Sequence, residues 1–159
     1  MRVDFLIVGA GQLGSRHGQA IARLEAARSI TFVDPNPESL AIAAARVREV
    51  APGITVSLLP TLDSHIGEIF LAIIATSSYE RPAALSRTLQ FSAPKNLLLE
   101  KLIASDLTGL KQILNELQNV HLPTYVNCPM PFFEHYLALA NLRESDEFLT
   151  VDYTVESNS

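Results

Sequence analysis

The sequence is poor in cysteine and has no tryptophan. Its one thiol, Cys128, leaves no partner for an internal disulfide, and a lone cysteine is typical of a reducing compartment, so we expect a cytoplasmic protein. No apolar run approaches the roughly 18 residues that a membrane-spanning helix requires. Asp4 interrupts the first apolar run and no cleavage-like region follows it, so we expect no signal peptide.

Positive charge is also scarce. The chain has 12 lysines and arginines against 17 aspartates and glutamates, which gives a formal net charge of −5. Proteins that bind nucleic acids cluster basic residues against the phosphate backbone, and no basic stripe occurs here. The acidic residues and histidines lack the spacing of metal ligands. We therefore expect no nucleic acid, no membrane and no metal ion as partners.

The remaining composition is that of a globular protein. Hydrophobic residues make up 48% of the chain and charged residues 18%, which excludes a disordered protein. A length of 159 residues corresponds to about one domain with a sizeable core.

Three glycines follow the first apolar run, Val3–Val8, and begin a helical pattern. A strand, then Gly-x-Gly-x-x-Gly, then a helix is the order that a dinucleotide-binding turn requires. We expect Gly9 to allow the tight turn, Gly11 to let the backbone approach a pyrophosphate, and Gly14 to let the helix pack close to the strand. The free N–H groups of the first helical turn then face the phosphates.

Gln12 and Leu13 belong to that turn, and we expect both to contact the cofactor. Asp34 adds a second signal, since it ends the next predicted strand twenty residues after Gly14. An acidic side chain there accepts hydrogen bonds from both ribose hydroxyls. It would repel a 2′-phosphate, and no basic residue follows before Arg46, so NAD is favoured over NADP. The alternative is that Asp34 only belongs to a turn, since Asp, Pro and Asn are common turn residues and Asp34–Pro37 contains all three.

Further candidate residues follow two later buried strands. The run that ends at Ala75 is continuously apolar, as in a strand buried on both faces, and Thr76 and Ser77 follow it. Ligands of an open α/β sheet bind outside the carboxyl ends of its strands. We therefore expect Ala75, Thr76 and Ser77 to contact the cofactor, against the alternative of a polar loop without contacts. Glu100 and Lys101 end the next buried strand.

The alternation of strands and helices predicts an α/β fold, a doubly wound parallel sheet of about six strands, the Rossmann fold. The expected strands are 3–8, 29–33, 55–59, 69–75, 96–99 and 123–127, and the expected helices are 12–27, 37–50, 79–91, a helix from Ser105 or Asp106 to 118, and 131–144.

Residues 150–156 alternate between polar and apolar, which predicts a half-buried strand of a different sheet. We therefore expect a dinucleotide-binding domain over 1–147, and over 148–159 the start of a truncated second, α+β domain. An unpaired strand edge of this kind invites pairing with a second copy of the chain, so a homo-oligomer through that strand is possible.

These features together resemble the amino-terminal half of the Gfo/Idh/MocA oxidoreductases, the glucose–fructose oxidoreductase and inositol dehydrogenase group. The residues that carry the resemblance are Gly9–His17, Val33–Asp34, Ala72–Ser77 and Leu99–Leu102, with Val126–Pro129 as a weaker fifth stretch. The matching stretches span nearly the whole chain.

The resemblance implies a nicotinamide cofactor and hydride exchange with a sugar, inositol or similar polyol. It also implies that Lys101 is catalytic, reaching both the nicotinamide and the substrate oxygen, and that Glu100 orients Lys101 or its loop. On this basis we expect both Glu100 and Lys101 among the cofactor-binding residues; taken alone, the two would indicate a surface ion pair. A cation beside a hydroxyl that becomes a carbonyl assists proton removal. This sequence has Leu102 where the family has proline, and Arg81 near a family histidine.

The family places its second catalytic group and most of its substrate pocket in a carboxyl-terminal domain. We therefore expect this chain to bind the cofactor with little or no turnover alone. One alternative is a non-catalytic NAD-binding or redox-sensing module that docks to a partner. A weaker alternative is a methyltransferase, which also combines a glycine turn with an acidic residue. We interpret His121 and His135 as surface or packing residues, and His17 as a buried or capping histidine rather than a cofactor contact.

Overall fold

The computed structural model describes residues 3–128, of which those up to Asn127 form one compact unit. The elements in chain order are β1 (Val3–Val8), α1 (Gln12–Ile21), β2 (Ala27–Val33), α2 (Pro37–Val50), β3 (Thr55–Leu59), β4 (Glu68–Ile69), β5 (Leu71–Ile74), α3 (Arg81–Phe91), β6 (Ala93–Pro94), β7 (Leu97–Glu100), α4 (Leu107–Val120) and β8 (Thr124–Asn127). The helix expected over 131–144, the strand over 150–156, the domain boundary at 147 and His135 lie outside the described residues.

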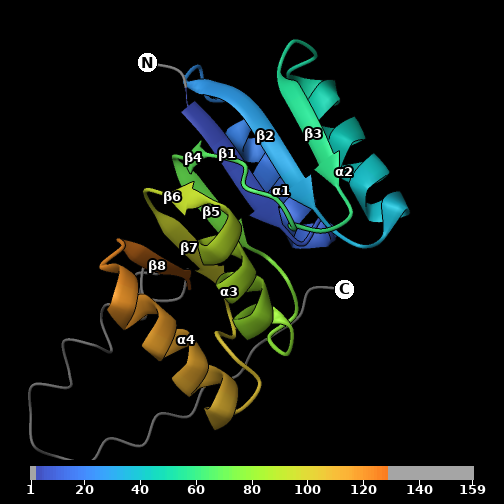
Figure 1. Cartoon of the computed structure of the whole chain (residues 1–159). Helices are drawn as coiled ribbons and strands as arrows, with labels where there is room; N and C mark the ends of the chain where they lie inside the picture. Colours follow the sequence, from blue (N-terminus) through green and yellow to red (C-terminus); the bar gives the residue numbers. More distant parts are fainter. Residues whose placement is uncertain (1–2, 129–159) are drawn as a thin grey trace, which may run out of the picture. The chain divides into compact units, whose positions relative to one another are not determined.

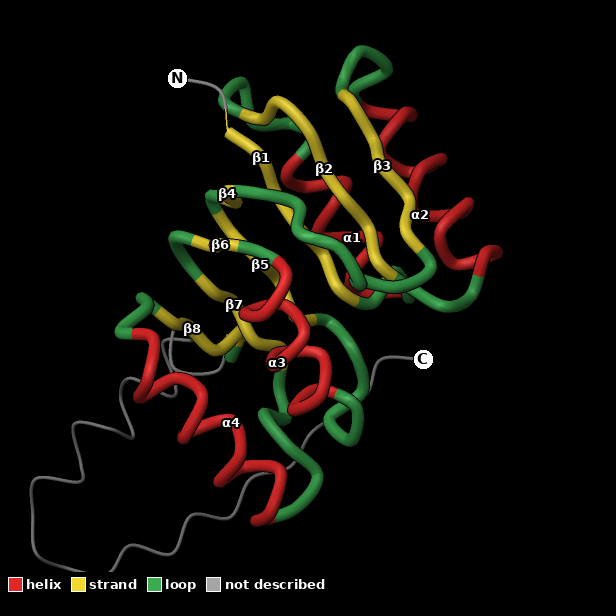
Figure 2. The backbone as a smooth tube through the Cα atoms, in the orientation of Figure 1, coloured by secondary structure: helices red, strands yellow, loops and turns green. Residues whose placement is uncertain are grey.

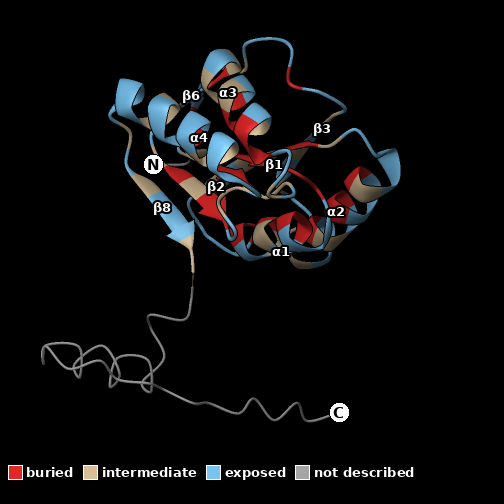
Figure 3. Cartoon of the chain, turned by 90° about the horizontal axis from the view of Figure 1, so that it is seen from below, coloured by how far each residue is buried: buried red, intermediate tan, exposed pale blue. Residues whose placement is uncertain are grey.

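The main sheet has six parallel strands in the order β3-β2-β1-β5-β7-β8. Helices α1 and α2 lie on one face of this sheet, and α3 and α4 lie on the other (Figure 1, Figure 3). This arrangement confirms the doubly wound Rossmann fold. The strand order reverses at β1, which pairs with β2 on one side and β5 on the other. Ligands bind at such a reversal, outside the carboxyl ends of the strands.

The alternation of side chains along β1 divides the hydrophobic core into two layers. Phe5 and Ile7 face α1 and α2, where they pack with Phe32 and other buried residues. Leu6 and Val8 face the opposite layer under α3 and α4. Because both faces of the central strands are covered, these strands consist of continuous apolar runs. The red of buried residues accordingly concentrates in and beside the sheet (Figure 3).

Two expected elements differ most from the structure. The run 69–75 is divided, because Ile69 pairs with Pro94 in a separate two-stranded sheet whereas Leu71 pairs with Phe5 in the main sheet (Figure 2). Phe70, between them, is 44% exposed. The first helix ends at Ile21, not at residue 27, because Ala27 already begins β2.

Side chains cap the amino-terminal ends of α2 and α4. Asn36 caps α2 by accepting hydrogen bonds from the N–H groups of Glu38 and Ser39. Asp106 rather than Ser105 caps α4, since its carboxylate accepts the N–H of Gly109 at 2.8 Å. These side chains satisfy N–H groups that would otherwise lack partners.

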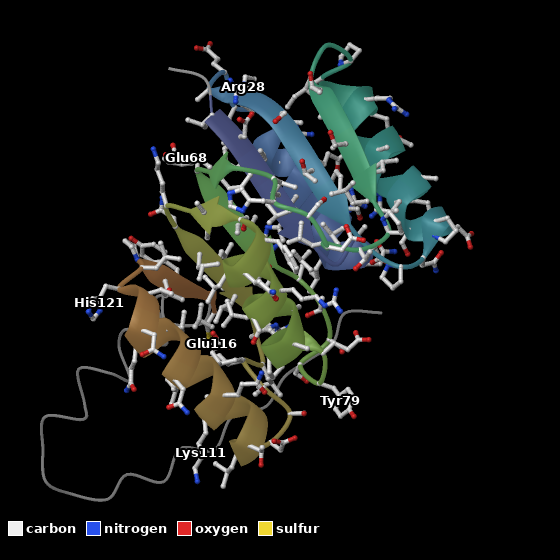
Figure 4. The ribbon with its side chains drawn as sticks, in the orientation of Figure 1. Arg28, Glu68, Tyr79, Lys111, Glu116 and His121 are labelled. Carbon is white, nitrogen blue, oxygen red and sulfur yellow. The ribbon has the colours of Figure 1, made fainter. Side chains whose placement is uncertain are left out.

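The apolar residues of α4 are only partly buried. Ile113 is buried, whereas Leu107 and Leu114 are exposed. Beyond the last turn of α4, His121 is exposed on the surface, which is one of the two roles expected for it (Figure 4). Its backbone adopts a left-handed conformation. None of the helices within residues 3–128 is long and apolar enough to cross a membrane.

Candidate functional site

The glycine turn lies where the sheet reverses, directly after β1. Gly9 has a φ of +95°, which disfavours any side chain, and its N–H donates to the Val33 carbonyl at 2.8 Å. A Cβ on Gly9 would also come within 2.8 Å of the Thr76 backbone nitrogen. The turn is therefore packed between the ends of β2 and β5.

The other two glycines have opposite surroundings. A Cβ on Gly14 would lie 1.8 Å from the Gly9 carbonyl oxygen and 3.3 Å from Ile7, so the helix contacts the strand directly. A Cβ on Gly11 would meet no atom within 4 Å, because Gly11 faces an open cleft. Gly14 is thus required for packing, whereas Gly11 leaves space that a ligand can occupy.

Asp34 supports the same turn from the end of β2. One carboxylate oxygen accepts the Ala10 N–H at 2.8 Å, and the other accepts the Asn36 N–H at 2.8 Å. Each oxygen has a second lone pair, so the carboxylate retains capacity for two more donors. Asp34 is half-exposed and lines the cleft. It can therefore hold the turn and bind the ribose hydroxyls at once.

Two neighbouring clefts meet at this turn. The larger, of about 850 Å³, is lined by Asp34 and the glycine turn, and extends along α3 to Arg87. The smaller, of about 340 Å³, is lined by Gln12, Leu13 and Lys101. The residues common to both clefts are Gly11, Ala75, Thr76 and Ser77. Tyr79, on the rim of the larger cleft, is 80% exposed and points outward (Figure 4).

The clefts bring together most of the residues expected from the sequence. Gly9, Asp34 and the segment after β5 line the larger cleft, and Lys101 lies exposed beside the smaller one. Gly14 and Glu100 line neither.

Glu100 instead lies in a buried polar cluster. It is 2% exposed, and its Oε1 lies 2.6 Å from His17 Nε2 and 2.6 Å from Asn127 Nδ2. These partners come from α1 and β8, so the carboxylate joins three elements. It is not a surface ion pair with Lys101, the alternative that the two residues alone would suggest. His17 is half-buried, in agreement with a packing role.

The Glu100 cluster predicts a pH dependence of stability. Burial raises the pKa of the Glu100 carboxyl, but hydrogen bonds from Asn127 and His17 outweigh burial and hold this pKa below its ordinary value. A carboxyl group whose pKa is lower in the folded state than in the unfolded state stabilises the fold at any pH above its unfolded-state pKa. This contribution is lost as the pH falls through the folded-state pKa. Glu100→Gln should therefore lower the thermal midpoint at pH 7, and the two midpoints should converge as the pH falls below about 4.3, the ordinary pKa of a glutamate.

Thermal unfolding followed by circular dichroism from pH 7 downward measures this difference. Glu49→Gln, at an exposed position of α2, serves as the matched control and should follow the wild-type curve. Parallel curves for the wild type and Glu100→Gln would contradict the prediction.

Arg81 is a residue that sequence reasoning did not assign to the site. It is 2% exposed, yet it lines the smaller cleft beside Lys101. Its position in the first turn of a predicted helix gave no sign of burial, since arginine is mostly exposed.

The clefts fit a dinucleotide. The Thr76 hydroxyl is buried without a hydrogen-bond partner at the junction of the two clefts, so it can bond to a ligand there. Gly11 leaves a space that any side chain would fill, and the first turn of α1 directs N–H groups toward an anion. The residues that would hold the cofactor are therefore Gly11, Gln12, Asp34 and Thr76. Within residues 3–128, no group of three or more histidine, cysteine or acidic side chains could hold a metal ion.

Comparisons with known proteins identify the family to which the described domain is similar. The family model of the Gfo/Idh/MocA group, described as an oxidoreductase family with an NAD-binding Rossmann fold, matches residues 3–128. No curated protein sequence matches the chain.

The solved structures similar to this chain include sugar and inositol dehydrogenases. The scyllo-inositol dehydrogenase of Lactobacillus casei is 19% identical with a TM-score of 0.69, over 90% of this chain and 41% of that one. The myo-inositol dehydrogenase of Lactobacillus casei, in complex with NAD(H) and myo-inositol, is 20% identical with a TM-score of 0.68, over 91% and 42%. The UDP-N-acetylglucosamine 3-dehydrogenase of Acidithiobacillus ferrooxidans is 18% identical with a TM-score of 0.66, over 89% and 43%.

At these identities the likeness shows a shared fold, and this chain spans about 41% of the length of the first of these structures. The family match covers the glycine turn, Asp34, the segment after β5 and Lys101 together. This chain belongs to the Gfo/Idh/MocA oxidoreductase family, whose NAD-binding Rossmann domain it contains.

Proposed function

We propose that this domain binds NAD and serves an oxidoreductase that exchanges hydride with a sugar, an inositol or a similar polyol. The observation that carries the proposal is the exposed Lys101, which lines the same cleft as Gly11 and Thr76. The inositol and amino-sugar dehydrogenases of the same fold support a polyhydroxylated substrate. The scarcity of cysteine supports a cytoplasmic location.

Each part of the cleft has a separate task in this proposal. Asp34 binds the ribose hydroxyls, the first turn of α1 binds the pyrophosphate, and Thr76 bonds to the cofactor near its nicotinamide end. When bound, the nicotinamide supplies the hydride donor or acceptor. The Lys101 ammonium stabilises negative charge on the substrate oxygen, which lowers the cost of removing its proton. Glu100 supports the Lys101 loop through His17 and Asn127, without contact with the cofactor.

The preference for NAD over NADP is the first test. A 2′-phosphate would lie beside the Asp34 carboxylate, and like charges at short range repel each other. We expect the chain to bind NADH at least about tenfold more tightly than NADPH, a difference of about 1.4 kcal/mol. Asp34→Ala should weaken NADH binding and reduce this preference. Isothermal titration calorimetry measures both affinities, since there is no tryptophan to report binding.

Asp63→Ala is the matched control, because Asp63 is an exposed acid that lines neither cleft. It should leave both affinities unchanged. Equal binding of NADH and NADPH to the wild type would overturn the preference for NAD. A folded chain that binds neither cofactor would overturn the proposed function and favour a domain that docks to a partner.

A further inference from the structure

Arg81 occupies an unusual place for an arginine. It lies in the first turn of α3 and is 2% exposed, so its guanidinium has left bulk water. Arginine is almost never fully buried unless its charge is paired or hydrogen-bonded. Burial lowers the pKa of Arg81, and the nearby charge of Glu100 opposes this effect. The residue therefore needs partners that compensate its desolvation.

The two terminal nitrogens have such partners in backbone carbonyls, whereas the buried Nε has none. One terminal nitrogen, Nη1, donates to the carbonyl of Glu100 at 2.6 Å and also to the carbonyl of Leu102. The other, Nη2, donates to the carbonyl of Thr76. Glu100 and Leu102 flank Lys101 in the chain, and Thr76 follows β5. One side chain thus joins the segments that follow β5 and β7.

The guanidinium suits this task because its donors lie in one plane and diverge at fixed angles. Hydrogen bonds from a charged donor are stronger than neutral ones, and buried carbonyls without a donor are costly. The backbone on each side of Lys101 is therefore held at a fixed place relative to Thr76. The Lys101 side chain remains exposed and free of this network.

We propose that Arg81 is a positioning residue that holds the Lys101 loop against the segment after β5 and so shapes the nicotinamide end of the cofactor cleft. This inference rests on the proposed function. Arg81 acts through the backbone and does not itself need to contact the cofactor. Its removal should therefore disturb one end of the cleft and leave the adenosine end, at Asp34, intact.

A comparison of two ligands separates this role from a general structural role. NADH carries the nicotinamide, whereas ADP-ribose shares its adenosine and pyrophosphate but lacks that ring. We expect the wild-type chain to bind NADH more tightly than ADP-ribose. In Arg81→Met the NADH affinity should fall about tenfold, and the ADP-ribose affinity should change by less than about twofold. Arg81→Lys, which keeps the charge without the planar fork, should give an intermediate loss for NADH alone.

Arg87→Met is the matched control on the same helix. Arg87 lines the larger cleft and donates to the Thr61 hydroxyl at 3.2 Å, so it belongs to the part that both ligands share. Its replacement should change both affinities by the same factor. Calorimetric titration of the 159-residue chain measures the NADH and ADP-ribose affinities of each variant, and circular dichroism establishes that each variant is folded.

The outcomes are distinct. A folded Arg81→Met with an unchanged ratio of NADH to ADP-ribose affinity would overturn the inference, as would equal binding of the two ligands by the wild type. If Arg81→Met does not fold, the ratio of NADH to ADP-ribose affinity in Arg81→Lys replaces it, and an unchanged ratio in that variant would overturn the inference. A wild-type chain that binds neither ligand would refute the proposed function itself.

Discussion

Replacement of Gly11 by valine is expected to abolish cofactor binding while the fold persists. A Cβ at this position meets no protein atom within 4 Å, and the backbone has φ −62° and ψ −162°, an extended conformation that does not require glycine. The added side chain would project into the space that both clefts share. The NADH affinity should fall at least about a hundredfold, or about 2.7 kcal/mol, because the pyrophosphate can no longer approach the backbone.

Calorimetry with NADH measures the loss, and chemical denaturation measures the stability of the same variant. The free energy of unfolding should stay within about 1 kcal/mol of the wild-type value. Retention of wild-type NADH affinity in Gly11→Val would mean that the cofactor does not pass over the glycine turn.

Replacement of Gly14 by alanine is expected to act on stability instead. Its Cβ would lie 1.8 Å from the Gly9 carbonyl oxygen, which is backbone and cannot rotate away as a side chain can. Either α1 must move off β1 or the turn at Gly9 must open, and Gly9 is itself packed against Thr76. We expect a loss of at least about 3 kcal/mol, a large fraction of the stability of a domain of this size.

Urea denaturation measures this change. Gly53→Ala is the control, since Gly53 lies in a turn where a Cβ meets nothing within 4 Å, and its stability should shift by no more than about 0.5 kcal/mol. A Gly14→Ala variant as stable as Gly53→Ala would show that α1 and β1 can separate at little cost. Together, Gly11→Val tests whether Gly11 leaves space for the ligand, and Gly14→Ala tests whether Gly14 lets α1 pack against β1.

Local patterns in the sequence were sufficient to predict the framework. The apolar runs and the glycine spacing predicted the parallel sheet, and Asp34 was placed correctly at the end of β2 because strand, turn and acid follow one another along the chain. The ends of elements were less predictable. The first helix ends at Ile21 because β2 must begin in register with β1, a constraint that helical periodicity does not contain.

The sequence alone thus determined the fold class, the family resemblance and three of the parts that line the clefts, namely the glycine turn, Asp34 and the segment after β5. These are encoded by neighbouring residues, through side-chain periodicity and the conformational freedom of glycine. The tertiary structure decided the tasks of Glu100 and Arg81. Glu100 meets His17, 83 positions away in the sequence, and Asn127, 27 positions away, and Arg81 reaches carbonyls 19 and 21 residues away. Such contacts depend on which strands lie adjacent in the sheet, so they arise only once the chain has folded.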